Sequence, residues 1–302
     1  MKILVVASFN RGSYAPFIVE QAEALRRAGC DIEFYGVTGK GIAGYLKAFP
    51  AYRRKIKAFE PDVIHAHYGL SGLFANLQRC VPVVTTYHGS DINKKSVLPF
   101  SKLAMALSKF NIFVSQRTVD IAKPRKNFSL IPCGVDLNDL QLTSKTAARD
   151  AMGLNAEKKY VLFAGAFDNS VKNYPLARSA MALLPEAELL ELKGYSREQV
   201  TLLMCAADAF LMTSFTEGSP QVVKEAMVCG CPIVSVDVGD VKDVISCVDR
   251  CAIAERSAGS LAEALLSAMG HGRTDGRKKI MGGPLLNDNV AERILSIYKS
   301  II

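Results

Sequence analysis

The sequence lacks any long apolar run, although 49% of its 302 residues are hydrophobic. No uninterrupted apolar segment approaches the roughly 20 residues that a membrane-spanning helix needs. The apolar residues 3–7 are too few for the hydrophobic region of a signal peptide, and the polar Asn10-Arg11-Gly12 follows them directly. We therefore expect a first strand at this position and a cytoplasmic protein.

The sequence also lacks the cysteine spacing of a structural zinc site. None of its eight cysteines forms a C-x-x-C pair, and the C-x-C at Cys229 and Cys231 has no second pair or histidine nearby. His65 and His67 could share one face of a strand, but no third ligand stands near them in the sequence. We expect no metal, and we interpret the cysteines as free thiols of a reducing compartment.

Acidic residues are scarce in the first half of the chain. Residues 1–142 contain 19 Lys and Arg against 10 Asp and Glu, whereas residues 143–302 contain 18 against 19. A basic cluster, Arg53-Arg54-Lys55 and Lys57, follows apolar residues at positions 42, 45, 46 and 49. That pattern is typical of a solvated helix face or of a segment that lies on anionic lipid. The asymmetry favours an anionic partner, either a membrane surface or a phosphate-bearing acceptor. Nucleic acid is not expected, because no nucleic-acid-binding motif is present.

Short apolar runs alternate with helical patterns along the whole chain. In the first half the expected strands are residues 3–7, 32–37, 63–65, 81–85, 111–114 and 129–131, and the expected helices are residues 17–28, 44–59, 70–79 and 98–109. The alternation restarts near Tyr160. Repeated strand–helix units predict parallel sheets with helices on both faces. The length favours two domains, which we expect at residues 1–142 and 143–286, followed by a last helix at 287–302.

The segment from Phe210 to Ser235 predicts a strand, a loop, a helix and a second strand. Ser219 suits an N-cap, Pro220 suits the first helical position, and Gly230 ends the helix. A helix amino terminus that follows a parallel strand can bind an anion.

Two glutamates accompany this anion site, Glu217 in the loop and Glu225 on the helix. Phosphate could meet the helix N–H groups while the carboxylates accept hydrogen bonds from hydroxyls, which suits a nucleoside diphosphate sugar. The alternative is an ordinary crossover helix with two solvated glutamates.

The eleven residues Glu-Gly-Ser-Pro-Gln-Val-Val-Lys-Glu-Ala-Met at 217–227 closely resemble the donor-site motif of retaining glycosyltransferases of family four. The match continues through Pro232-Ile233-Val234 to residues 237–241, and weaker matches cover most of the chain. The resemblance implies an α/β protein of the GT-B fold, with two Rossmann-like domains whose parallel sheets face a central cleft. The first domain would bind the acceptor and the second the nucleotide sugar, and the last helix would cross back to the first domain.

The resemblance also implies roles for residues at the matching positions. Glu225 would bind the ribose hydroxyls, Glu217 the sugar hydroxyls, and Lys172 the diphosphate together with the backbone of residues 219–221. His88, in Tyr87-His88-Gly89-Ser90-Asp91, resembles the family's His-Gly-x-Asp segment and would contact the sugar. The expected catalytic residues are therefore His88, Glu217 and Lys172. The expected donor-binding residues are Gly12, Gly165, Lys172, Asn173, Tyr195, Gly218, Ser219, Pro220, Gln221 and Glu225.

The implied reaction moves a hexose-like sugar from a nucleoside diphosphate sugar to a glycan, lipid-linked or other acceptor, with retention and without a metal or cofactor. Such enzymes serve polysaccharide biosynthesis, and the basic first half suggests a cytoplasmic enzyme that is peripheral on the inner face of the cell membrane. Ala166 stands where the family carries an Arg, and Cys133 stands where it carries an Asn. Two alternatives with the same fold stay open. One is a nucleotide-sugar epimerase, which would isomerise the donor without an acceptor. The other is a non-catalytic nucleotide-sugar-binding subunit, which Ala166 and a first domain shorter than is usual for the family favour.

Overall fold

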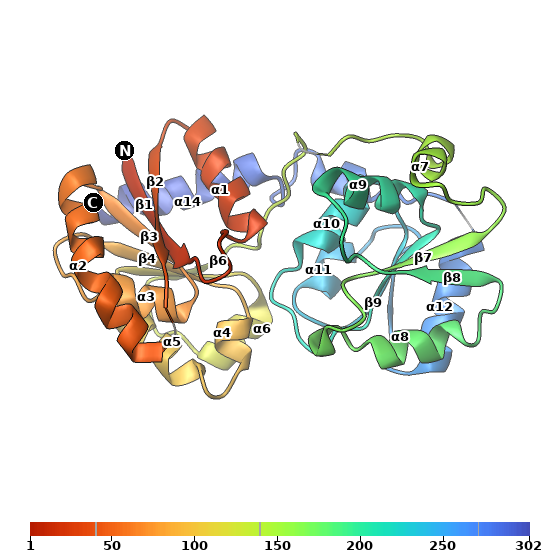
Figure 1. The fold of residues 1–302 in the computed structure, drawn as a ribbon, viewed down its shortest axis with the longest axis horizontal. Coiled ribbons are helices and arrows are strands. Elements are labelled where there is room, and N and C mark those ends of the chain that lie inside the picture. The colour runs from red at the N-terminus through yellow and green to blue at the C-terminus, as the bar shows by residue number, and fades with distance from the viewer. Residues whose placement is uncertain (40, 139, 271) are drawn as a thin grey trace. The chain divides into compact units, whose positions relative to one another are not determined.

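The computed structural model describes residues 1–39, 41–138, 140–270 and 272–302, and the chain divides into two compact units (Figure 1). Unit 1 comprises Met1–Gly134 together with Asn287–Ile302, and unit 2 comprises Val135–Leu286. The division therefore falls after Gly134 rather than after residue 142. Val135 is buried and its backbone N–H donates to the Leu285 carbonyl at 2.9 Å, so this stretch belongs to unit 2.

Unit 1 contains a six-stranded parallel sheet with the order β2-β1-β3-β4-β5-β6. Its strands are β1 (Lys2–Ser8), β2 (Asp31–Val37), β3 (Val63–His67), β4 (Val83–Tyr87), β5 (Phe110–Phe113) and β6 (Phe128–Leu130). Its helices are α1 (Pro16–Arg27), α2 (Gly41–Phe59), α3 (Gly69–Ala75), α4 (Ser90–Asn93), α5 (Leu98–Leu107), α6 (Gln116–Ala122) and α14 (Asn287–Ile301). The expected strand–helix alternation is confirmed.

Both faces of this sheet are covered, as a continuous apolar run in a parallel strand predicts. Along β1, Ile3 and Val5 face a core cluster that includes α1 and α14, whereas Leu4 and Val6 face a cluster that includes residues of α2 and α3. Successive side chains point to opposite faces of a strand, so one apolar run serves two cores.

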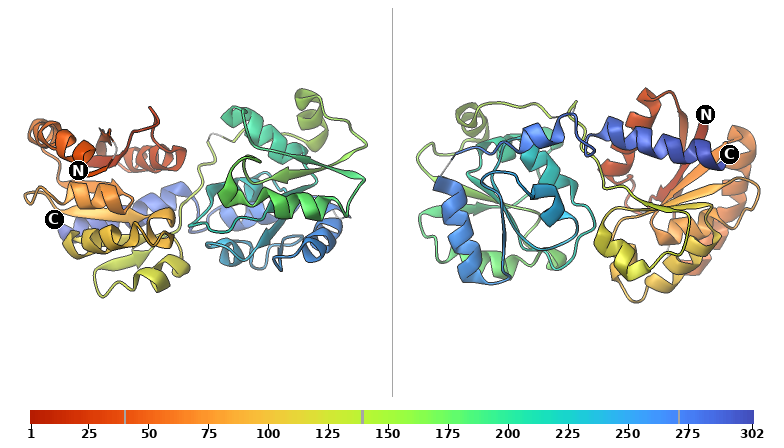
Figure 2. Two further views of the ribbon diagram at one scale, coloured as in Figure 1. Left: turned by 60° about the horizontal axis from the view of Figure 1, so that its bottom comes forward. Right: turned by 180° about the vertical axis from the view of Figure 1, so that it is seen from behind.

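Helix α14 returns to unit 1 after the chain has passed through unit 2, and it lies along α1 (Figure 2). Its buried stripe includes Val290, Ile294, Ile297 and Tyr298. These residues recur every three or four positions, which places them on one face of the helix. The last helix thus completes the core of the first unit.

Unit 2 contains a five-stranded parallel sheet with the order β11-β10-β9-β7-β8. Its strands are β7 (Lys159–Phe163), β8 (Ala187–Leu190), β9 (Ala209–Met212), β10 (Ile233–Val236) and β11 (Ala252–Ala254). Its helices are α7 (Lys145–Met152), the 3₁₀ turn η1 (Ser170–Lys172), α8 (Tyr174–Met181), α9 (Arg197–Ala206), α10 (Gln221–Val228), α11 (Val241–Ile245), α12 (Ala258–Gly270) and α13 (Gly276–Ile280).

Helix α7 is anchored to the sheet of unit 2. The buried Asp208, just before β9, accepts hydrogen bonds from Lys145 Nζ at 2.6 Å and Arg149 Nη2 at 2.7 Å. The ion pairs of these two cations with a buried carboxylate fix α7 against the sheet. Each unit is thus a Rossmann-like α/β layer structure of its own.

Candidate active site

The candidate donor site lies where the strand order of unit 2 reverses. β8 lies on one side of β7 and β9 on the other, so the loops after β7 and β9 leave the sheet side by side. Ligands of open parallel sheets bind at such a point, beyond the carboxyl ends of the strands. These two loops contain Gly165–Asn173 and Thr213–Pro220.

Several contacts bind these two loops together. The Thr213 hydroxyl donates to the carbonyl of Lys172 at 2.8 Å or of Asn173 at 3.0 Å, and the Phe215 N–H donates to the Val171 carbonyl at 2.9 Å. Gly165 leaves room for the Lys172 side chain, because a Cβ there would lie 2.8 Å from Lys172 Cγ. The loop geometry therefore holds Lys172 close over the end of β7.

Lys172 and Glu217, both expected catalytic residues, form an ion pair in which Nζ lies 2.8 Å from Oε1. Both side chains are half-buried, with 18% and 16% of their surface exposed. The two charges compensate each other, so neither glutamate nor lysine is a freely solvated surface group. The pair places an ammonium group next to a carboxylate at the ends of β7 and β9.

Ser219 does not cap helix α10, so the N-cap prediction is wrong. The helix begins at Gln221, Pro220 occupies the N-cap position, and no side chain caps the helix. The Ser219 hydroxyl instead donates to the Asp240 carboxylate at 2.5 Å, a charged acceptor that makes a strong hydrogen bond.

The buried Lys224 completes this cluster, and the sequence interpretation missed it. Its Nζ donates to Ser219 Oγ at 2.5 Å and to Asp240 Oδ2 at 3.2 Å, and its side chain has no exposed surface. The loop that carries Asp240 packs closely on the loop after β9, since a Cβ on Gly239 would lie 2.6 Å from the Gly218 carbonyl oxygen. The cluster fixes the loop that leads into α10.

Glu225 is buried rather than solvated, and it pairs with Arg197 at 2.7 Å. Burial raises the pKa of its carboxyl, and the nearby Arg197 opposes that shift. Arg197 opens α9, where Ser196 and Gln199 form a capping box. The capping-box pattern was the available sequence signal, but it identifies a helix start and not a partner for Glu225.

Tyr195 and the loop after β8 lie beside the same region. The Leu192 N–H donates to the Gly165 carbonyl at 3.0 Å, and Glu191 accepts from the Phe167 N–H at 2.8 Å. Tyr195 itself is exposed. The loops after β7, β8 and β9 therefore form one connected set.

Arg256 is a second basic residue that the sequence interpretation missed. It follows β11, donates to the carbonyls of Thr213 and Ser214 at 2.9 Å each, and lies over the Phe215 ring at 5.6 Å. Ala166 has no side chain that could fill the role of the family's Arg. Arg256 stabilises the loop after β9, which carries Glu217.

The other two predicted residues, His88 and Gly12, lie in unit 1. Gly12 is exposed in the loop after β1, where its φ of +76° suits glycine and its N–H donates to the Phe9 carbonyl at 3.0 Å. The donor-binding set is thus divided between the units, and unit 2 contains all of it except Gly12.

His88 belongs to a row of three histidines at the carboxyl ends of β3 and β4. Its Nε2 lies 3.0 Å from His67 Nδ1, and its Nδ1 lies 3.7 Å from the Cys133 sulfur. The rings of Phe17 and Tyr68 lie 4.6 and 4.8 Å from its own. The sequence suggested that His65 and His67 could lie on one face of a strand, and His88 adds a third histidine beside them. Cys133 contacts the imidazole of His88.

The fully buried His65 extends the row toward α14. The Tyr298 hydroxyl lies 2.5 Å from its Nδ1, and its Nε2 lies 2.7 Å from the Thr86 hydroxyl. Burial lowers the pKa of His65 and of His88 to about 3, and lowers that of His67 well below its usual range. The imidazoles are therefore neutral at physiological pH and act as hydrogen-bonding groups. Within the described ranges, no group of three or more His, Cys, Asp or Glu side chains could hold a metal ion.

The carboxylate of Asp91 holds the backbone at His88 in place. It accepts from the backbone N–H of His88 at 3.0 Å and of Gly69 at 2.9 Å, and burial raises its pKa to about 6. A cavity of about 390 Å³ opens beside it at the same edge of the sheet. The lining includes hydroxyl, amide and cationic groups, among them Ser8, Asn10, Tyr68, Ser90 and Lys94.

The family assignment follows from the pattern of matches along the chain. Residues 15–139 match Glycosyltransferase Family 4, and residues 161–271 match Glycosyl transferases group 1. The chain belongs to glycosyltransferase family 4. The first match covers most of unit 1, and the second covers the segments that carry Lys172, Glu217 and Glu225.

The curated relatives of this family 4 chain that are described below are glycosyltransferases. It is 27% identical over 265 residues to a teichuronic acid biosynthesis glycosyltransferase of Bacillus subtilis, covering 75% of this chain and 68% of that protein. It is 26% identical over 260 residues to D-inositol 3-phosphate glycosyltransferase of Mycolicibacterium smegmatis, covering 68% of this chain and 60% of that protein. The chain thus spans about two thirds of the length of these relatives.

Solved structures support the GT-B fold. Sucrose-phosphate synthase of Thermosynechococcus elongatus superposes with a TM-score of 0.85 at 17% identity, covering 99% of this chain and 98% of that one. Anabaena HepE in complex with UDP and glucose gives 0.76 at 16% identity, covering 99% and 100%. In the described part of the chain, no helix is both long and apolar enough to cross a membrane.

Proposed function

We propose that this chain is a glycosyltransferase that moves a sugar from a nucleoside diphosphate sugar to a hydroxyl of a glycan or lipid-linked acceptor, with retention at the anomeric carbon. The observation that carries the proposal is the Lys172–Glu217 pair, which lies at the strand-order reversal of unit 2 beside the start of α10. The UDP and glucose bound to the Anabaena relative and the glycan pathway of the Bacillus relative agree with this substrate class.

In this proposal the departing diphosphate is stabilised by Lys172 and by the first N–H groups of α10. A helix amino terminus and a fixed ammonium group both favour negative charge, and they do so without reorganisation during the reaction. The proposed reaction therefore needs no metal. Glu217 accepts hydrogen bonds from the donor sugar once the phosphate draws Lys172 away from it.

Glu225 is proposed to bind the ribose hydroxyls while Arg197 holds its carboxylate charged and oriented. Burial alone would favour the neutral acid. Arg197 opposes this effect and favours the charged carboxylate, which is the better hydrogen-bond acceptor. His88 is proposed to donate or accept a hydrogen bond at a sugar hydroxyl as a neutral imidazole. None of the assigned groups serves as a nucleophile, and we propose a same-face displacement in which a diphosphate oxygen takes the acceptor proton.

The two alternatives are less well supported. Both family matches describe glycosyltransferases, which favours neither an epimerase nor a non-catalytic binding subunit. We further propose that the enzyme works at the cytoplasmic face of an anionic membrane, since unit 1 carries 21 Lys and Arg against 10 Asp and Glu.

The direct test is a transfer assay with UDP, GDP and ADP sugars, with and without a chelator. Release of one nucleoside diphosphate that depends on an added glycan or polyprenyl-phosphate-linked acceptor, and an axial or equatorial product linkage that matches the donor, are the expected results. Isomerisation of the donor without acceptor would indicate an epimerase instead. Loss of activity with the chelator would contradict the metal-independent part of the proposal.

A further inference from the structure

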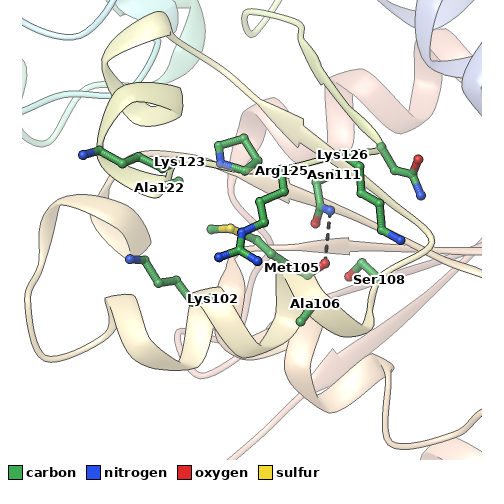
Figure 3. A pocket seen from close by; sticks show the side chains of 11 residues that line it. Lys102, Met105, Ala106, Ser108, Asn111, Ala122, Lys123, Arg125 and Lys126 are labelled. Carbon is green, nitrogen blue, oxygen red and sulfur yellow. Dashed lines mark hydrogen bonds between the residues drawn. The ribbon is translucent and has the colours of Figure 1, made fainter.

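A second cavity in unit 1 is strongly basic and shares no lining residue with the cavity beside Asp91. It has a volume of about 620 Å³, and Lys102 of α5 and Lys123, Arg125 and Lys126 of the segment after α6 line it (Figure 3). An adjoining cavity of about 330 Å³ shares Lys126 in its lining and adds Arg79 and Lys109. We refer to these six basic residues, with the two cavities between them, as the basic groove.

No carboxylate compensates the charge of the basic groove. None of its six basic side chains forms an ion pair with a carboxylate of the described residues, and no Asp or Glu lines either cavity. Exposed lysines elsewhere do have partners, as in the pairs Lys158–Glu188 and Lys193–Asp168. A concave surface with uncompensated positive charge concentrates anions.

The groove lies at the amino ends of the strands in the unit 1 sheet, whereas the histidine row lies at their carboxyl ends. Its segments Ser108–Lys109 and Lys123–Asn127 precede β5 and β6, whereas His88 follows β4. In a parallel sheet the amino and carboxyl ends of the strands form opposite edges. The groove is therefore distinct from the region of unit 1 that contains His88.

Exposed apolar side chains are present on the same elements as the groove residues and on the adjoining strand β6. Phe100 and Leu103 of α5 are 42% and 50% exposed on either side of the basic Lys102. Ile121 of α6 and Phe128 of β6 are 38% and 39% exposed on the adjoining elements. Exposed apolar groups beside basic groups are the combination that binds an anionic bilayer, since the apolar groups enter the acyl boundary while the cations meet the headgroups.

Helix α2, whose pattern suggested a lipid-binding segment, has its apolar side chains engaged in the core. The rings of Tyr45 and Phe49 pack on Phe74 at 5.5 and 6.1 Å, and Lys55 forms an ion pair with Glu33. Leu46 is exposed, and Ile42 lies outside the residues whose side chains are described. The amphipathic pattern of α2 is thus explained by packing on the sheet.

We propose that the basic groove and the outer face of α5 form a docking surface for an anionic lipid bilayer, with a lipid phosphate held in the groove. The charge of the groove suits a headgroup phosphate, because the Arg125 side chain lies between those of Lys102 and Lys126 (Figure 3). The inference sharpens the proposed membrane location, but it does not depend on the transfer chemistry. Vesicle binding and transfer to a soluble acceptor can therefore fail separately.

The test is co-sedimentation of the full chain with phosphatidylglycerol–phosphatidylcholine vesicles and with phosphatidylcholine vesicles alone. The groove variant K102Q/R125Q/K126Q removes three charges, and the matched variant R53Q/R54Q/K57Q removes three exposed charges from α2. At low salt we expect the wild type and the α2 variant to bind anionic vesicles only. The groove variant should bind about a hundredfold more weakly, as the loss of three headgroup contacts implies. Thermal midpoints equal to wild type show that each variant is folded.

Two further measurements show whether the groove binds a lipid phosphate or a free phosphate. L103S should weaken vesicle binding while leaving its salt dependence unchanged, because it removes an apolar contact and no charge. Inorganic pyrophosphate should compete with vesicles only weakly. The proposal is overturned if the groove variant binds vesicles like wild type, if the α2 variant loses binding equally, or if pyrophosphate binds the groove while anionic vesicles do not.

Discussion

At the scale of single residues, each charged group of the candidate donor site has a partner in the structure. Lys172 pairs with Glu217 across two loops, and Arg197 pairs with Glu225 across two helices. Neither pairing follows from sequence spacing, because the partners lie 45 and 28 positions apart. The motif identifies the glutamates, and the fold supplies the cations.

Replacing Lys172 by Ala should reduce turnover about 10²–10³-fold, because a fixed cation on developing diphosphate charge contributes on that scale. The free energy of unfolding should change by no more than about 1 kcal/mol, since the ion pair is partly exposed. Steady-state kinetics and urea unfolding measure the two effects. Lys158→Ala, at an exposed ion pair, is the control and should retain activity. Normal turnover in Lys172→Ala would remove this lysine from the site.

Replacing Glu225 by Ala should weaken nucleoside diphosphate binding at least tenfold, because a charged acceptor of two ribose hydroxyls is lost. Titration calorimetry with the preferred nucleotide gives the dissociation constant. Glu198→Ala removes an exposed carboxylate one residue from Arg197 and should leave the affinity unchanged. Equal affinity in Glu225→Ala and the wild type would reject the ribose assignment.

The buried Lys224 should be a stability residue. Lys224→Ala strands the Asp240 carboxylate, and breaking a buried ion pair in this way costs about 3–5 kcal/mol. The double variant Lys224→Met/Asp240→Asn leaves no unpaired charge and should recover much of that loss in urea unfolding. If the single variant were as stable as wild type, the pair would have no structural role.

At the scale of elements, the sequence predicts what depends on local pattern and misses what depends on packing. Apolar runs such as residues 3–7 correctly predict strands, because a fully buried parallel strand needs a continuous apolar sequence. The local pattern gives a wrong prediction at Ser219. Serine commonly caps helices, but the Ser219 hydroxyl donates to Asp240 on another loop. The pattern of α2 also leaves a lipid-binding segment open, whereas Tyr45 and Phe49 pack against the core.

The histidine row formed by β3 and β4 should make the protein sensitive to acid. His65, His67 and His88 stay neutral when folded but take up protons when unfolded, so their contribution is complete above about pH 6.5 and falls as the pH drops toward 3. Asp91 acts in the opposite direction between its usual 3.8 and about 6, since the folded state protonates it first. Three imidazoles against one carboxyl give a net loss of stability on acidification.

Urea unfolding between pH 6.5 and 4.5 should show this loss. His65→Gln should reduce the slope by about 1.4 kcal/mol per pH unit, the contribution of one proton. The comparison of slopes separates this effect from any constant cost of the substitution. An unchanged slope would mean that His65 titrates equally in the folded and unfolded states.

At the scale of the whole molecule, two Rossmann-like units divide the chain and its charge. Unit 1 carries the basic excess, the histidine row and the basic groove, while unit 2 carries 16 Lys and Arg against 19 Asp and Glu and contains the donor-site motif. The return of α14 to unit 1 follows from the resemblance to the family, and its buried stripe supplies the physical reason. The exact boundary at Gly134 could not be predicted, because it depends on the pairing of Val135 with residues 150 positions later.

The most direct test of the donor site is thermal stability of the full chain with UDP, GDP, ADP and their common sugars, with and without magnesium. A ligand at about 100 times its dissociation constant should stabilise the protein by about 2.7 kcal/mol. We expect a selective shift for one base, independent of magnesium and lost in Glu225→Ala. No shift with any nucleotide would contradict the assignment of a nucleoside diphosphate sugar site to unit 2.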